Sequence, residues 1–202
     1  MALDPRLPSS TLCNNAGRIL PDGATMFEIK PQNPETYRQQ TRRSTLIIAV
    51  VFIALAMLVS SAAVLLFGTP GGDNFRLNLA GVLVGLVLSM ALLRLRFWSQ
   101  PWMAAAVYGW QLKRSLMSVT NVMHHVKSGV QAGSPAAMKL LRFYHLGVTQ
   151  MHQLDANSSA LSQMVHEIDQ HKAAMEAQGL DPEQPRLDPA WIEAVKKDGG
   201  KP

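Results

Sequence analysis

The sequence predicts an all-α membrane protein: a two-helix transmembrane hairpin, then a cytoplasmic antiparallel helical hairpin with coiled-coil-like spacing and a short C-terminal helix. Two apolar runs predict the membrane part. Residues 44–67 contain no charged residue, and residues 77–93 are apolar with Asn78 as their only strongly polar residue. The cytoplasmic part is predicted by apolar residues that recur at alternating spacings of four and three after residue 101.

Each apolar run has the length of a membrane-spanning helix. At about 1.5 Å rise per residue, residues 44–67 span about 36 Å and residues 77–93 about 26 Å, against a hydrocarbon core of about 30 Å. Backbone amides in lipid need partners within their own segment, so each run should be helical. Residues 68–76 then form a short loop outside the membrane.

Positively charged residues lie on the outer sides of the two runs. Residues 26–43, before the first run, contain four Lys or Arg residues, and residues 94–114, after the second, contain four. The loop offers only Arg76, which Asp73 opposes. The positive-inside rule therefore predicts a multi-pass protein with both termini in the cytoplasm and the loop outside.

A second group of residues is predicted to lie at the membrane–water interface, where indole rings reach headgroup level and arginines extend outward. The group consists of Arg42, Arg43, Arg94, Arg96, Trp98 and Trp102. Because many cations lie beside the spans, the net charge of +5 and pI near 9.6 favour anionic headgroups as partner. No motif supports nucleic-acid binding, so the predicted partner is the bilayer.

Small residues are predicted to form the contact between the two spans. When the two antiparallel runs are aligned about the midpoint of their loop, Gly81 lies opposite Ala63, Gly85 opposite Ser60 and Ser89 opposite Ala56. Close backbone approach at small residues drives helix association in lipid. The sequence favours closure of the hairpin within one chain over homodimerisation through the same glycines.

The N-terminal part contains no span. Residues 1–25 lack a periodic pattern and are predicted to be a disordered leader; translation from Met26 would make them a start-site artefact. Residues 26–43 are predicted to be a cytoplasmic N-terminal segment. Cys13 is the lone cysteine and cannot form an internal disulfide, as expected in the cytoplasm.

Residues 94–178 are predicted to form the cytoplasmic hairpin, with helices at about 101–130 and 135–178. Ser134-Pro135 is typical of a helix start. Residues 155–159 could break the second helix, but the same apolar spacing continues beyond them, so one long helix is expected, kinked there. Two narrow apolar faces make a thin core, which self-association would enlarge.

The tail, residues 179–202, is proline-rich and contains a predicted short helix at 189–198, which Asp188 caps and Pro189 begins. Its apolar side carries Trp191, Ile192 and Val195. The sequence favours docking of this helix on its own hairpin, with binding to a partner's groove as the alternative.

Histidine and carboxylate residues recur along the second cytoplasmic helix, and such residues could bind a metal ion: His145, His152, Asp155, His166 and Asp169. The two His-x-x-Asp pairs lie about 21 Å apart along one helix, so one ion could not use both. An exposed face with local His–Asp contacts is therefore the favoured interpretation. No nucleophile setting or phosphate loop is present, so we expect neither an enzyme nor a cofactor.

The stretch MFEIKPQNPETYRQQTRRSTLIIAVVFIALAM, together with LRLRFWSQPW and the Met- and His-rich helices that follow, resembles a family of small gammaproteobacterial inner-membrane proteins. That family is classified only as a domain of unknown function. The resemblance extends from Met26 to about residue 198, and it implies a bacterial two-span membrane protein without transferring any functional residue.

Three functional hypotheses follow. The leading one is a non-enzymatic, membrane-anchored scaffold or interaction protein whose cytoplasmic helices bind a protein partner or a second copy. The first alternative is a small accessory subunit of a transport or envelope-stress system that acts through the glycines of the second span. The third is a metal-binding sensor or enzyme that uses His145, His152 and His166.

Overall fold

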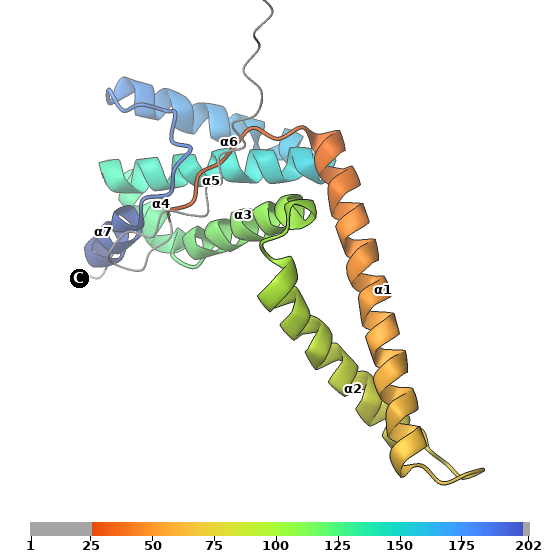
Figure 1. Ribbon diagram of the computed structural model, residues 1–202. Helices are drawn as coiled ribbons and strands as arrows, with labels where there is room; N and C mark the ends of the chain where they lie inside the picture. The colour runs from red at the N-terminus through yellow and green to blue at the C-terminus, as the bar shows by residue number, and fades with distance from the viewer. Residues whose placement is uncertain (1–25, 200–202) are drawn as a thin grey trace, which may run out of the picture.

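The computed structural model describes residues 26–199, and this part of the chain is helical, with no β-strand. The prediction of an all-α chain is thus confirmed over that range. The predicted disordered leader, residues 1–25, lies outside the described residues, as do residues 200–202 of the tail. Figure 1 shows two long helices that extend from one end of a bundle of shorter helices.

The first long helix, α1 (Pro34–Phe67), begins ten residues before the apolar run. The Asn33 side chain caps it by accepting hydrogen bonds from the N–H groups of Glu35 (3.0 Å) and Thr36 (3.1 Å). Proline at the first helical position needs no N–H partner there. Much of the segment 26–43 is therefore helical and continuous with the first apolar run.

The second long helix, α2 (Phe75–Leu92), begins two residues before its apolar run and continues into a π-helical turn, η1 (Leu93–Phe97). The Asn74 side chain holds the loop by accepting a hydrogen bond from the N–H of Thr69 (3.1 Å). The helices α1 and α2 lie side by side over their loop-proximal parts (Figure 1).

Both segments, Pro34–Phe67 and Phe75–Phe97, are long and apolar enough to cross a membrane by length and composition. Their most apolar stretches are almost entirely uncovered by the rest of the protein, with 6% and 17% of residues buried. They therefore do not serve as the core of the helical bundle.

The remaining helices form that bundle at the end of α1 opposite the loop (Figure 1). They are the short 3₁₀ turn η2 (Pro101–Met103), α3 (Ala104–Thr120), α4 (Met123–Gln131), α5 (Pro135–Leu154), α6 (Ser158–Ala177) and α7 (Pro189–Gly199). The central helix is α5, which contacts α3, α4, α6 and α7.

The predicted helix at 101–130 is divided rather than continuous. It begins with η2, and α3 and α4 are separated by a turn at Asn121 and Val122. The turn places Val122 in the core with 7% exposure, between the buried Val119 and Val126. Positions 119, 122 and 126 would share one face of a straight helix as well, so the burial of these valines does not by itself account for the break.

The prediction of one long helix at 135–178 is wrong. The chain turns at Ala156, which has a left-handed φ of 56°, and α6 then returns antiparallel to α5. The face of α6 that meets the bundle centres on His171 and Met175, both buried. Val165 belongs to the apolar spacing of this segment but is 45% exposed, because the fold-back turns a different face of α6 toward α5.

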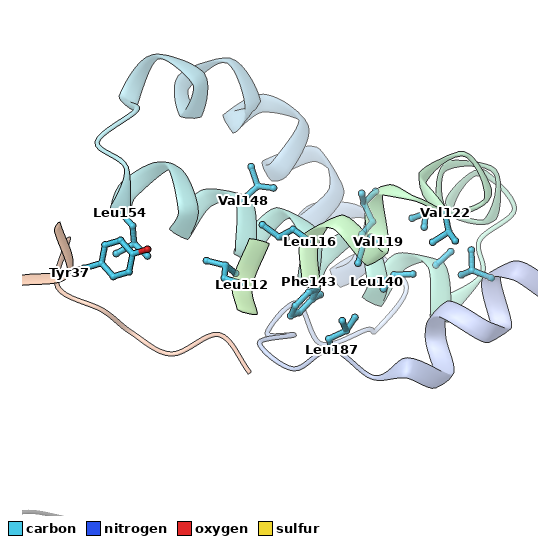
Figure 2. Close-up of a cluster of buried hydrophobic side chains, with 14 of the residues drawn as sticks. Tyr37, Leu112, Leu116, Val119, Val122, Leu140, Phe143, Val148, Leu154 and Leu187 are labelled. Atoms are coloured by element: carbon cyan, nitrogen blue, oxygen red, sulfur yellow. The ribbon is translucent and has the colours of Figure 1, made fainter. Parts of the chain in front are cut away.

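The core lies where α3 and α4 cross α5, as Figure 2 shows. Leu112 and Leu116 of α3 face Gly147 of α5, where a Cβ atom would lie 2.7 Å from Leu116 Cδ2. Glycine at this position therefore lets the two helices approach closely. Phe143 is fully buried beside them.

The two ends of the described chain are joined on the bundle. The N–H of Ile29 donates to Pro185 O (2.8 Å), and the N–H of Leu187 donates to Phe27 O (2.9 Å). Between these bonds the side chains of Glu28 and Arg186 form an ion pair of 3.0 Å.

The C-terminal helix docks on its own bundle. It contacts α4 and α5, its Val195 is 2% exposed, and Trp191 packs against the core. The sequence allowed this helix either to dock on its own chain or to bind a partner's groove. In the structure it docks on its own chain.

Candidate functional site

The contact between α1 and α2 is built on backbone-to-backbone approach at two glycines. A Cβ atom on Gly81 would lie 2.4 Å from Ser60 Cα, and one on Gly85 would lie 2.7 Å from Ala56 Cα. Neither glycine can be replaced without moving a helix. The surface of α2 at both glycines is therefore covered by α1 of the same chain.

The register of this contact differs from the predicted one by about one helical turn. Gly81 faces Ser60 rather than Ala63, and Gly85 faces Ala56 rather than Ser60. The difference arises because α2 begins at Phe75, ahead of its apolar run, which moves the midpoint of the hairpin toward α1.

The other members of the predicted contact are placed less centrally. Ala63 is only half-buried. Ser89 is buried, but its hydroxyl donates to Gly85 O within its own helix (2.8 Å). The Ser60 hydroxyl donates to Asn78 Oδ1 (2.7 Å), which gives the one strongly polar side chain of the second run a partner on α1.

Aromatic rings and arginines collect where α2 ends and the bundle begins. The rings of Trp98 and Trp110 meet edge to face, with centroids 5.0 Å apart and planes at 85°. The rings of Phe97 and Trp102 meet in the same manner at 5.3 Å. The Ser44 hydroxyl of α1 donates to Trp102 O (2.6 Å), which fixes η2 to α1.

The predicted interface residues are divided by exposure. Arg42, Arg43, Arg94 and Arg96 are exposed, whereas Trp98 and Trp102 are half-buried by these ring contacts. The sequence prediction missed Trp110 and Arg114 on α3. Their spacing of four residues, opposite the apolar Leu112, was the signal that could have identified them.

Three ionisable side chains, Arg142, His145 and His171, are buried between α5 and α6, and the exposed Glu167 lies beside His145. We call these four residues the histidine cluster. The two imidazole rings stand at 85° with centroids 5.2 Å apart. His171 Nε2 lies 3.0 Å from Met138 O, and because a carbonyl only accepts, this nitrogen carries the proton. His145 Nε2 lies 3.9 Å from Glu167 Oε1.

Polar atoms in the histidine cluster lack full hydrogen bonding. Arg142 donates through Nε to Pro182 O (2.8 Å), but its Nη1 and the Nδ1 of His145 are buried without a partner. A buried polar group without a partner costs about 1–3 kcal/mol of free energy.

The surroundings keep both histidines neutral. Burial, assisted by His171 and then by the Arg142 charge, lowers the pKa of His145 from 6.5 to about 4. Burial also lowers the pKa of His171, although its hydrogen bond to Met138 acts in the opposite direction. The arrangement holds α6 on α5 and is sensitive to protonation.

The predicted metal-ligand candidates are not brought together. Asp155 forms an ion pair with Lys113 (3.6 Å), and His166 contacts Gln170 (2.8 Å). His152 is half-buried and Asp169 exposed on different helices. Within residues 26–199 no three His, Cys, Asp or Glu side chains are placed to hold a metal ion. The fold-back at Ala156 separates the two His-x-x-Asp pairs onto two helices and instead pairs His145 with His171.

Comparison with known proteins gives one match. No curated protein and no solved structure matches this chain. A family model described as a protein of unknown function, DUF3087, matches residues 27–192, from the paired N-terminal segment through α1–α6 and into the docked α7. The chain therefore belongs to the DUF3087 family.

Proposed function

We propose that this protein is a non-enzymatic inner-membrane protein in which α1 and α2 span the bilayer. Helices α3–α7 then form a cytoplasmic domain that binds a protein partner or a second copy of the chain. One observation carries the proposal: two long apolar helices, almost uncovered by protein, are joined directly to a bundle that has its own core.

The exposure of α1 and α2 favours lipid as their surroundings. A core helix of a soluble protein buries most of its apolar side chains, whereas Leu65, Leu66 and Phe67 are 85%, 72% and 75% exposed. In water this apolar surface would be unfavourable. In a bilayer it is the surface that a spanning helix presents.

The distribution of charge supports the orientation. Exposed arginines flank both apolar runs on the bundle side, whereas the loop end carries Arg76, in the first turn of α2, and Asp73 in the loop. Because short loops follow the positive-inside rule most strictly, the bundle should lie in the cytoplasm.

Reporter fusions test this topology. An alkaline phosphatase, which is active only in the periplasm, should work when fused at Gly72 and fail when fused after Gly199. A cytoplasm-specific reporter at the same two positions should give the opposite pattern. Phosphatase activity after Gly199 would overturn the orientation, and equal activity at both positions would overturn the hairpin.

The partner-binding part of the proposal rests on α6. This helix lies on the side of α5 opposite α3 (Figure 1), and it exposes Val165, an apolar residue outside the two long helices. A photo-crosslinking residue at Val165 in cells should give a specific protein adduct, whereas the same residue at the exposed Gln111 of α3 should not. Absence of any adduct at Val165, including a dimer, would contradict the proposal.

The two alternatives have less support. An accessory subunit acting through Gly81 and Gly85 would need these glycines free, but they contact Ser60 and Ala56 of the same chain. A metal-dependent sensor would need ligands brought together, and the described residues offer no such group. Stoichiometric zinc in the purified protein would favour the metal hypothesis.

A further inference from the structure

One face of α3 is exposed although it carries large side chains. Trp110 is 46% and Met117 64% exposed, with Arg114 exposed between them. At about 100° per residue these three positions lie within an arc of about 60°. The buried Leu112 and Leu116 point to the opposite side, toward α5. One face of α3 therefore packs into the core, and the opposite face, which also carries large side chains, is not covered by protein.

This face continues the end of α2. The Arg94 guanidinium lies over the Trp98 ring (5.0 Å), Trp98 contacts Trp110 (5.0 Å), and the Arg114 guanidinium lies over Trp110 (5.1 Å). Trp98 directly follows the segment that would reach headgroup level. The ring contact therefore places Trp110 at the same level. Figure 1 shows α3 running across the end of α2 rather than along it.

The charges on this side of the protein are mainly positive. Residues 74–154, which include α2, α3, α4 and α5, contain no Asp or Glu, whereas residues 155–198 contain nine of the 14 acidic residues. The cations near the exposed face are Arg94, Arg96 and Arg114, whereas Lys113 is paired with Asp155. A basic surface with tryptophan and methionine between the charges complements anionic headgroups above an apolar layer.

We propose that α3 lies on the cytoplasmic leaflet, with Trp110, Arg114 and Met117 in contact with anionic lipid. This inference rests on the proposed membrane insertion of α1 and α2 and adds a second, peripheral contact with the bilayer. The contact fixes the bundle against the membrane and directs α6, on the far side of α5, toward the cytoplasm.

Fluorescence quenching on the full chain in lipid nanodiscs tests the proposal. In a Cys13→Ser background, an environment-sensitive dye is attached at Met117→Cys, at Ile53→Cys in α1, or at Ala173→Cys in α6; all three positions are exposed. Nanodiscs contain a headgroup-proximal or chain-located quencher, in phosphatidylcholine alone or mixed with phosphatidylglycerol.

We expect the Ile53 dye to be quenched from the chain region, the Met117 dye from the headgroup region, and the Ala173 dye from neither. Quenching at Met117 should fall strongly in phosphatidylcholine alone and with Arg114→Glu, but not with the matched control Lys172→Glu on α6.

Quenching at Ile53 with none at Met117 would overturn this inference and leave the proposed function intact. Absence of quenching at Ile53 would overturn the membrane insertion itself. Quenching at Met117 that ignores both lipid charge and Arg114→Glu would overturn the anionic-lipid contact.

Discussion

The His145 ring of α5 stands edge-on to the His171 ring of α6, with centroids 5.2 Å apart, and Arg142 lies within the same buried cluster. The pair joins two helices through imidazoles whose pKa values are lowered mainly by burial and further by the Arg142 charge. We therefore expect the attachment of α6, the helix proposed to bind a partner, to depend on pH.

The first prediction is that stability falls on acidification. Because the pKa of His145 is about 4 in the folded state and 6.5 in the unfolded chain, the unfolded chain binds more protons between these values. The contribution of His145 is fully present above pH 6.5 and is lost as the pH falls toward 4. The full loss is about 3 kcal/mol. Urea unfolding of the detergent-solubilised protein at pH 7.5 and 4.5 measures it.

Two variants make that test specific. His145→Gln cannot titrate, so its stability should change less between pH 7.5 and 4.5 than that of the wild type. His166→Gln, on the exposed face of α6, should keep the wild-type change. Equal pH dependence in His145→Gln and wild type would refute the assignment to His145.

The second prediction concerns the contact between α1 and α2. Gly81→Leu should separate the helices, because even a Cβ atom would lie 2.4 Å from Ser60 Cα. Overpacking of this kind costs about 1–3 kcal/mol. Spin labels at the exposed Ile53 and Leu88 should report a longer and broader distance distribution. Val87→Leu, on the side of α2 that faces away from α1, serves as control and should leave the distribution unchanged.

The third prediction concerns the turn between α5 and α6. Ala156 has a φ of 56°, a conformation that glycine adopts with less strain. Ala156→Gly should therefore stabilise the protein by about 1 kcal/mol. Ala174→Gly, at an exposed site inside α6, should destabilise it by about 1 kcal/mol. Urea midpoints that shift in the same direction for both variants would show that the chain does not turn at residue 156.

The fourth prediction separates hydrogen bonding from charge in the paired terminal segments. Ile29→Pro removes the N–H that donates to Pro185 O and should destabilise the protein by about 1–3 kcal/mol. Glu28→Gln removes only the exposed ion pair with Arg186 and should cost less than about 1 kcal/mol. Hydrogen exchange at Leu187 should speed up in the first variant alone.

The sequence was sufficient where local signals decide the structure. Two uncharged runs define the apolar parts of α1 and α2, and prolines at first-turn positions mark the starts of α5 and α7. These features depend on residues a few positions apart. The membership in a family of unknown function also followed from the sequence, since the match begins at the segment that opens with Met26-Phe27.

Two contacts between site residues could not be predicted, because their residues are brought together only by the path of the chain. Trp110 and Arg114 lie next to Trp98 and Arg94 only because α3 turns back across the end of α2. His145 and His171 meet only because α6 returns along α5. Neither contact has a signature in the spacing of neighbouring residues.

Residues 135–178 show most clearly what the tertiary structure alone decided. Apolar residues at spacings of three and four are the same in a helix that continues and in one that breaks and folds back, so the pattern could not choose between them. The break at Ala156 costs local strain, and the burial of Met175 and His171 against α5 offsets it. That balance depends on contacts more than twenty residues apart, which is why the helical character of this segment was readable from the sequence and its path was not.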